Sequence, residues 1–429
     1  MTDRPLVIKF GGTSVGEGAA FLRAARIAAG AAQDRPVAVV VSAMNGATDA
    51  LLGFAEGFAD PSTRTSAGAT REGSLVELYR ALADQHLAAA CEAVPEELLP
   101  EVEDRLQTIL ERLVRPASAT SNDLAARKDA IASCGERLSA EILAAAINGL
   151  GTPAAVAPDD PIATDGGFGG AKVLAEETRR RTRGCVWPLL DTGLVAVVPG
   201  YVGRAPGGAV TTLGRGGSDL SATVLGRALC SREVWIMTDV EGVLEADPRL
   251  IPDAGSIRHL SYREAAQFAT LGAKVLHPDT VAPAAAGGIE VRVRSTFDPD
   301  SSGTRISGRE GEPGVRGVAL SRGLSLTHVR SEAAESAFCV LGADADGLKV
   351  LVDGTPADVA AIVCIGAPTD RDLLTGLRCL HETGIRPLFA GNTSAGLLFA
   401  VSGDVAELGL RALHAELVSA IPTNMKEVA

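Results

Sequence analysis

The sequence has no apolar run long enough to cross a lipid bilayer, because glycine, proline or a charged residue interrupts each apolar stretch. Its beginning, MTDRPLVIKF, lacks the basic segment and long apolar run that are typical of a secretory signal. The formal net charge is -13, and no local basic stripe stands out. These absences argue against nucleic-acid and membrane partners and predict a cytoplasmic protein.

The cysteine pattern excludes two further classes of protein. Seven cysteines are present and none forms a C-x-x-C pair, so neither a disulfide framework nor a zinc knuckle is indicated. We interpret Cys134 as a small packed residue and not as a nucleophile. No metal site is predicted from the residues.

The length of 429 residues predicts two or three domains. Continuous apolar runs such as PLVIKF and PVAVVVSA are typical of strands covered on both faces, and they alternate with alanine-rich helical stretches. We therefore expect an α/β domain over residues 1–307 with a mainly parallel sheet. Two amphipathic stretches between residues 60 and 128 predict a helical excursion from that sheet.

A polar, glycine-rich stretch over residues 298–314 marks a boundary near Ser307. Beyond it, the order of the shorter elements predicts a small βαββα module, complete over residues 360–418. We expect residues 308–429 to be a regulatory region.

The turn KFGGTS follows the first predicted strand and precedes a helix. Its amides could point at an anion while Lys9 supplies a mobile charge. The turn is neither a Walker A loop nor a G-x-G-x-x-G loop. A plain strand-end turn is the alternative.

The loop TTLGRGGSD leads into another helix. Its three glycines would let the backbone approach a ligand, Arg215 offers a fork to a carboxylate, and Asp219 could orient a lysine. The alternative is a hairpin whose arginine pairs with a surface acid. Because ligands of open α/β sheets gather where strand ends meet, we expect both loops at one edge.

Three further segments allow two interpretations each. By spacing alone, Glu136 in the helix KDAIASCGERLSAEIL is a solvated residue and not a ligand. The turn TDVEGVLEADPR is a nucleotide clamp or an ordinary loop. In GAKVLHP, packing is the more common role for a histidine such as His277.

Six ordered motifs together resemble those of aspartate kinases in the amino-acid kinase superfamily: KFGGTSV, VSAMNGATDAL, GERLS, TTLGRGGSDLSA, TDVEGVLEADPR and GAKVLHP. The resemblance covers the chain to about Ser307, and the tail resembles that family's pair of ACT domains. It implies a three-layer αβα amino-acid kinase fold followed by a small α+β region of ACT type.

The resemblance also implies roles for individual residues. Lys9 would stabilise the transferred phosphate and Asp219 would organise the lysines at the reaction centre. The phosphate cradle would be formed by Gly11, Gly12, Thr13, Ser14, Gly216 and Gly217. Aspartate would be bound by Glu136 at its ammonium group, by Arg215 at its α-carboxylate, and by Ser42 and Thr48 near its side chain. ATP would be held by Thr238, Asp239, Asp247, Arg249 and Lys274. One departure is Leu244, where family members commonly have a tyrosine.

The implied activity is ATP- and Mg²⁺-dependent phosphorylation of L-aspartate to 4-phospho-L-aspartate by a homodimer that pairs through its ACT domains. Two alternatives remain at this level. The chain could phosphorylate a different amino dicarboxylate in specialised metabolism, because the residues for an α-amino acid head group do not determine the length of the side chain. It could also be a non-catalytic amino-acid sensor, although Lys9, Arg215 and Asp219 are all present.

The tail predicts weak or altered feedback inhibition by lysine or threonine. The first ACT module would have to be assembled from residues 324–354, where Ser331 to Phe338 offers little more than two helical turns and no glycine follows THVRS. An effector that cannot bind cannot shift a conformational equilibrium. Initial rates of aspartate phosphorylation with millimolar lysine, threonine or both would test this. Strong inhibition by either would mean that a merely divergent segment still forms the site.

Overall fold

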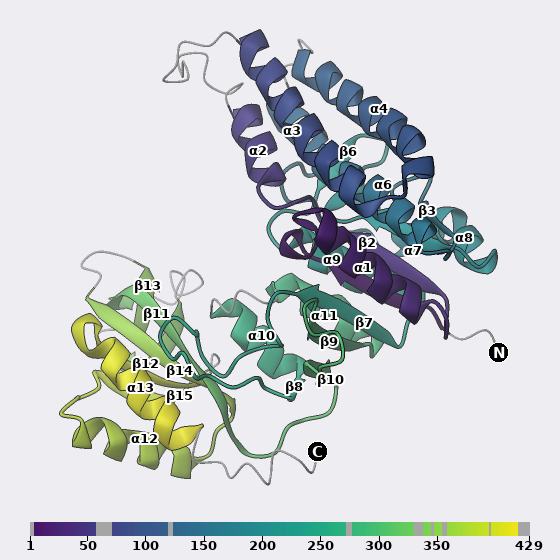
Figure 1. Cartoon of the computed structure of the whole chain (residues 1–429). Coiled ribbons are helices and arrows are strands. Elements are labelled where there is room, and N and C mark those ends of the chain that lie inside the picture. Colours follow the sequence, from purple (N-terminus) through teal and green to yellow (C-terminus); the bar gives the residue numbers. More distant parts are fainter. Residues whose placement is uncertain are drawn as a thin grey trace. The chain divides into compact units, whose positions relative to one another are not determined.

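The computed structural model describes residues 4–56, 71–118, 123–271, 277–329, 338–344, 347–353, 358–393 and 396–418 (Figure 1). Contacts between residues divide the chain into two compact units. The first unit is Met1–Glu241 with Asp279–Ser302, and the second is Gly242–Pro278 with Gly303–Ala429. The predicted boundary near Ser307 stays a prediction of domain organisation.

Parallel strands form the centre of the first unit, in the order β3-β4-β2-β1-β7-β9. Their bounds are β1 Leu6–Phe10, β2 Val37–Val41, β3 Ala154–Val156, β4 Val195–Pro199, β7 Glu233–Thr238 and β9 Glu290–Ser295. All residues of β1, β2 and β4 are buried, as expected for strands that helices cover on both faces. The predicted α/β class with a mainly parallel sheet is confirmed.

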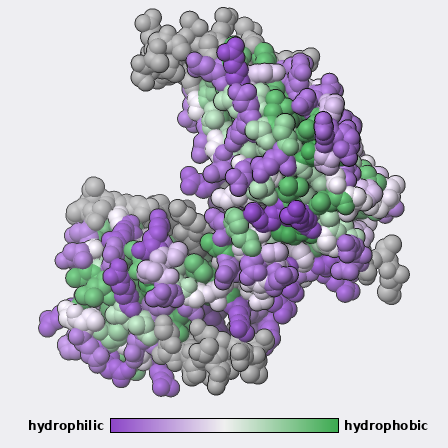
Figure 2. All heavy atoms as spheres, viewed as in Figure 1, coloured by the Kyte–Doolittle hydropathy of each residue, from purple (hydrophilic) through white to green (hydrophobic). Residues whose placement is uncertain are grey.

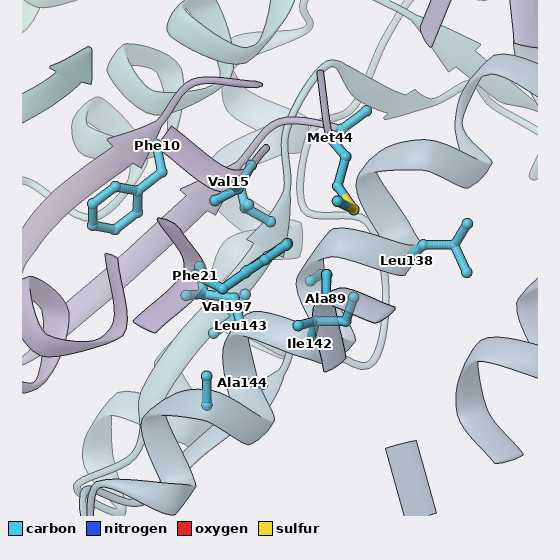
Figure 3. Packing of buried hydrophobic residues seen from close by; sticks show 14 of the residues in the cluster. Phe10, Val15, Phe21, Met44, Ala89, Leu138, Ile142, Leu143, Ala144 and Val197 are labelled. Carbon is cyan, nitrogen blue, oxygen red and sulfur yellow. The ribbon is translucent and has the colours of Figure 1, made fainter. Parts of the chain in front are cut away.

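Helices pack on this sheet through a continuous apolar core (Figure 3). Phe21 of α1 (Gly18–Ala31) and Leu143 of α6 (Cys134–Gly149) meet Val197 of β4 in that core. Helix α9 (Gly217–Ala228) contacts β1 and β7. Other elements of this unit are α2 (Ala47–Glu56), α5 (Leu124–Ala132), α7 (Ala175–Cys185), α8 (Trp187–Asp191), β5 (Val202–Arg204) and β6 (Val210–Thr212). Helix α11 (Pro278–Gly287) begins at Pro278, the last residue of the second unit's first segment.

Two long helices occupy much of the predicted helical excursion. Helix α3 (Arg71–Ala93) contacts α1, α4 (Leu99–Ser118) and α6, and Figure 1 shows α3 and α4 running alongside each other. Residues 60–70 and 119–122 of the excursion lie outside the described part of the chain.

An antiparallel sheet forms the main part of the second unit, in the order β12-β13-β11-β14-β16-β15. From β14 (Val359–Ala367) onward the elements are α12 (Asp370–Glu382), β15 (Phe389–Thr393), β16 (Gly396–Ser402) and α13 (Ala406–Leu417), which is the βαββα order expected from the sequence. Before them come β11 (Gly314–Val329), β12 (Cys339–Asp344) and β13 (Gly347–Asp353). The same unit contains the parallel pair β8 (His259–Ser261) and β10 (Thr304–Ser307) with α10 (Tyr262–Thr270).

The short helix expected over Ser331 to Phe338 falls almost wholly outside the described residues, so the shortened first module stays a prediction. Among the helices that the structure describes, none is both long and apolar enough to span a membrane. Figure 2 shows hydrophilic residues over much of the visible surface, with hydrophobic residues in smaller groups between them.

A buried histidine in α3 predicts a pH-dependent loss of stability. His86 is fully buried, its Nδ1 donates to the Leu82 carbonyl at 2.7 Å, and its Nε2 has no partner among the described residues. Burial lowers the pKa of His86 from 6.5 to about 4. Between these values the unfolded chain binds a proton that the folded chain does not, so the free energy of unfolding falls as the pH falls.

We expect this one group to lower the free energy of unfolding by about 2 kcal/mol between pH 7 and pH 5, and His86→Leu to remove that part of the pH dependence. Urea unfolding at the two pH values would measure it. His381→Leu, which alters an exposed histidine of α12, is the matched control. Equal pH dependence in the wild type and His86→Leu would contradict the prediction.

Candidate functional site

A lysine–aspartate ion pair lies at the carboxyl end of β1. Lys9 Nζ is 2.6 Å from Asp219 Oδ1, and the two side chains are only 11% and 13% exposed. Lys9 comes from the KFGGTS turn and Asp219 from the first turn of α9, so the structure brings two predicted site residues together. Because water screens this pair little, each charge interacts more strongly with its partner than in an exposed pair.

Glycines allow the backbone to approach this pair closely. A Cβ at Gly11 would lie 3.2 Å from Lys9 Nζ, and one at Gly12 would lie 3.1 Å from the Ala43 carbonyl oxygen. Gly216, which precedes α9, has a φ of 72°, a conformation that glycine adopts most readily. Gly217 follows it as the first residue of α9.

The hydroxyls of the first turn differ in their surroundings. Thr13 is exposed, whereas the buried Ser14 shares a hydrogen bond of 2.7 Å with Thr296 Oγ1. The short 3-10 helix Gly12–Val15 contains both residues. An anion at this turn would therefore meet the Thr13 side chain more easily than that of Ser14.

Glu136 is a buried carboxylate with an open oxygen. It lies in the first turn of α6, is 3% exposed, and its Oε2 has no hydrogen-bond partner among the described residues. The amide of Ala43 hydrogen-bonds to the carboxylate, but burial outweighs it and raises the pKa of Glu136 to about 8. The expectation of a solvated glutamate, drawn from spacing alone, is wrong. A Cβ at Gly135 would come within 2.7 Å of the Ala43 Cβ, so a glycine is what lets α6 approach this segment so closely.

The other residues predicted to bind aspartate, Ser42, Thr48 and Arg215, differ in burial. The Ser42 amide donates to the Phe10 carbonyl at 3.1 Å, which holds Ser42 beside the end of β1. Thr48 is half-buried near the start of α2, and Arg215 is exposed in the loop before α9.

The residues predicted to bind ATP are distributed over both units. Thr238 ends β7, which pairs with β1, and its Oγ1 donates to Asp239 Oδ1 at 3.1 Å. Asp247 and Arg249 belong to the second unit, where Arg249 Nε donates to Asp247 Oδ1 at 2.9 Å.

The motif GAKVLHP contains two residues that the sequence analysis singled out. Lys274 lies outside the described residues, and His277 is half-buried. Within the described ranges, no group of three or more histidine, cysteine, aspartate or glutamate side chains could hold a metal ion.

Two buried aspartates were missed by the sequence analysis. Asp129 is 2% exposed and accepts hydrogen bonds from Thr212 N at 2.8 Å, Thr212 Oγ1 at 2.9 Å and Gly169 N at 3.0 Å. It thereby holds β6, the strand that leads into the loop of Arg215. Burial raises the pKa of Asp129, although these hydrogen bonds oppose the shift. The only local sign of this role in the sequence is that Asp129 is a charged residue two helical turns before Glu136.

Asp160 anchors the other side of α6. Its carboxylate is 2.8 Å from Arg137 Nη2 and 2.5 Å from Arg204 Nη2, so it ties the residue after Glu136 to β5. Nothing in the local sequence around Asp160 indicates these distant partners.

Tyr201 is a third residue that local patterns did not indicate. It has a φ of 64°, which is uncommon for a residue other than glycine. A Cβ at Gly217 would come within 2.7 Å of the Tyr201 ring, and the Tyr201 amide donates to Ser221 Oγ at 3.0 Å. Its ring therefore fixes the position of the first turn of α9.

The chemistry available in the first unit follows from these contacts. A lysine held by a carboxylate, glycine amides at a strand end and a helix N-terminus together suit an anion such as a phosphoryl group. A buried carboxylate with an open oxygen suits a cation.

Comparisons with known proteins agree with this interpretation. A model of the amino acid kinase family matches residues 4–295. Aspartokinase 2 (chloroplastic) of Arabidopsis thaliana is 34% identical over 304 residues, which are 70% of this chain and 54% of that protein. Lysine-sensitive aspartokinase 3 of Escherichia coli (strain K12) is 34% identical over 332 residues, 76% of this chain and 69% of that protein. The chain spans about half the length of several of the curated relatives it matches.

A solved structure is similar over almost the whole chain. The crystal structure of E. coli aspartokinase III in complex with aspartate and ADP has a TM-score of 0.74 and 27% sequence identity, and the match covers 96% of this chain and 99% of that one.

The buried carboxylate of Glu136 predicts that the protein loses stability as the pH rises. With the pKa raised from 4.5 to about 8, the folded chain binds a proton between these values that the unfolded chain has released. The free energy of unfolding should therefore fall by about 3 kcal/mol between pH 5 and pH 7.5 from this group.

Glu136→Gln keeps the shape without the charge, so it should remove this fall and be more stable than the wild type at pH 7.5. Urea unfolding at both pH values would measure the difference. Glu177→Gln, in an exposed ion pair with Arg180, is the control. A wild type and Glu136→Gln with the same pH dependence would show that Glu136 is ionised in the folded protein.

Proposed function

The chain belongs to the amino acid kinase family and, within it, to the aspartokinases, and from this premise we propose that it transfers the γ-phosphoryl group of ATP to the side-chain carboxylate of L-aspartate. The observation that carries the proposal is the largely buried pair of Lys9 and Asp219, whose atoms Nζ and Oδ1 lie 2.6 Å apart beside two glycine-bearing turns. The products are 4-phospho-L-aspartate and ADP.

The proposed reaction needs charge neutralisation more than proton transfer. A side-chain oxygen of aspartate bonds to the γ-phosphorus as the bond from that phosphorus to the bridging oxygen breaks, and ADP departs. The attacking carboxylate is already ionised near pH 7, so no base is required. Lys9 opposes the repulsion between the two anions, and Asp219 holds its ammonium group in place. Gly11, Gly12, Gly216 and Gly217 would cradle the phosphoryl group, with Thr13 and Ser14 beside them. Because the Gly11 amide donates to the Met237 carbonyl at 3.3 Å and the Gly217 amide to the Gly214 carbonyl at 3.0 Å, these two glycines would act by letting the backbone approach the phosphoryl group.

Recognition of the amino acid would rest on complementary charges. The open oxygen of Glu136 would receive the ammonium group, and Arg215 would grip the α-carboxylate. Ser42 and Thr48 would lie near the side chain. Because the pKa of Glu136 is about 8 in the free protein, binding an ammonium group near pH 7 should ionise Glu136 and release a proton.

On the nucleotide side, we propose Thr238, Asp239, Asp247, Arg249 and Lys274 as contacts to ATP. Mg²⁺ would arrive on the ATP phosphates, where it typically keeps several waters and needs few protein ligands. The described residues contain no cluster of three or more metal-ligating side chains, so we assign no residue and no step to the metal ion.

The remaining parts of the proposal concern the cellular role. We propose a cytoplasmic homodimer that pairs through ACT domains in the C-terminal region. Its reaction would be the first step toward lysine, threonine and methionine.

Lys9→Ala should lower the turnover of aspartate phosphorylation by about 10²- to 10³-fold, because it removes a preorganised charge at the transferred group. Release of ADP and formation of the acyl phosphate, trapped with hydroxylamine, would measure the rate. Arg179→Ala, which removes a cation from an exposed ion pair with Glu176, is the control. Near-normal turnover in Lys9→Ala would remove Lys9 from the reaction centre.

The same assay with aspartate, glutamate and their analogues tests the substrate. Phosphorylation of another amino dicarboxylate in preference to aspartate would correct the substrate and leave the site intact. A chain that binds ADP and phosphorylates none of them would refute the proposed activity.

A further inference from the structure

The loop that carries Asp247 and Arg249 is built into the core of the second unit. Ala246 is part of the apolar cluster between the antiparallel sheet and its two helices, and three more loop residues pack against that cluster, namely Leu250, Ile251 and Ala254. The loop also closes on itself, since the Glu245 amide donates to the Gly255 carbonyl at 2.9 Å. It is therefore anchored like an element of the core and not like a free surface loop.

Strand β11 supports the loop through the backbone. The amide of Val318 donates to the Glu245 carbonyl at 2.7 Å. A Cβ at Gly317 would come within 2.3 Å of the same carbonyl oxygen, so only glycine allows β11 and the loop to approach this closely. Residue 245 is thus fixed from the side of the sheet.

Helix α13 holds the loop at two points that bracket Asp247 and Arg249. His414 Nε2 is 3.6 Å from Glu245 Oε2, and these side chains are only 8% and 10% exposed. One turn earlier, Arg411 Nε donates to the Leu250 carbonyl at 3.2 Å. The two contacts join one helix face to both ends of the segment between residues 245 and 250.

We infer that α13 is a positioning element for nucleotide binding, with Arg411 and His414 as positioning residues that touch neither substrate. The inference rests on the proposed role of Asp247 and Arg249 in holding ATP. A loop that is already ordered binds its ligand more tightly, because less conformational entropy is lost on binding. By linkage, a nucleotide that needs the ordered loop must in turn stabilise the packing of α13.

Steady-state kinetics separates positioning from general stability. Arg411 is 60% exposed, so Arg411→Ala should leave the fold intact and raise the KM for ATP by about 3- to 10-fold through the lost hydrogen bond. The KM for aspartate and kcat should each change by less than about 2-fold. His414→Leu should act in the same direction, and His414→Gln, which keeps a hydrogen-bond donor, should recover part of the affinity.

Arg378→Ala is the matched control. Arg378 is an exposed arginine of α12 whose Nη2 lies 3.3 Å from Glu416 Oε1 of α13, so its loss disturbs the same helix without touching the loop. It should leave the KM for ATP unchanged. A rise equal to that in Arg411→Ala would assign the effect to the stability of α13 and overturn the inference.

Binding measurements decide the matter independently of turnover. Titration with ADP should show weaker binding to Arg411→Ala than to the wild type. Hydrogen exchange should show that ADP slows amide exchange in α13 of the wild type, and less so in Arg411→Ala. Unchanged ADP affinity together with unprotected α13 amides would refute the inference. A wild type that binds ADP without phosphorylating aspartate would refute only the proposed activity, since these two measurements would still test α13.

Discussion

A lysine ammonium that is almost withdrawn from water must have a carboxylate beside it, and much of the first unit is arranged to satisfy that condition. Lys9 and Asp219 belong to elements more than two hundred residues apart, yet their charged atoms lie 2.6 Å apart. The pairing requires β1 at the centre of the sheet, with α9 starting next to its end. Removing either partner would leave an uncompensated charge in a region of low dielectric, which costs several kcal/mol. The ion pair can therefore form only with this order of strands in the sheet.

Asp129 and Glu136 are both buried carboxylates of the first unit, yet the first has a structural role and the second is a candidate ligand group. Asp129 accepts hydrogen bonds from two backbone amides and a hydroxyl, so its negative charge already has partners within the fold. Glu136 keeps an oxygen without one. Burial raises the pKa of both, but only Glu136 has unused capacity for an added cation. The supply of hydrogen-bond donors, more than burial, separates a structural carboxylate from a candidate ligand group.

Residues with local signals were predictable, and residues whose roles depend on distant partners were not. Unbroken apolar runs predicted β1, β2 and β4, because strands covered on both faces need no polar alternation. Glycines flanked by charges predicted the turns around Lys9 and Arg215. The burial of Glu136 could not be predicted from helical spacing, since it depends on how closely Gly135 lets α6 approach Ala43. Asp160 meets Arg204 only through tertiary structure. Likewise, the contact between α13 and the loop that carries Asp247 and Arg249 joins segments some 160 residues apart.

The chain crosses between its two compact units three times, after Glu241, Pro278 and Ser302. Strand β9, which pairs with β7, therefore leaves the ribosome later than the whole of Gly242–Pro278. Until then β7 presents an open row of amides and carbonyls on that side, the kind of edge that other chains can pair with. That edge of β7 is covered only after the chain has returned from the second unit to the first. For the same reason a gene cut after Glu241 would encode a sheet lacking its β9 neighbour, so the first unit cannot be inherited or exchanged as one uninterrupted segment.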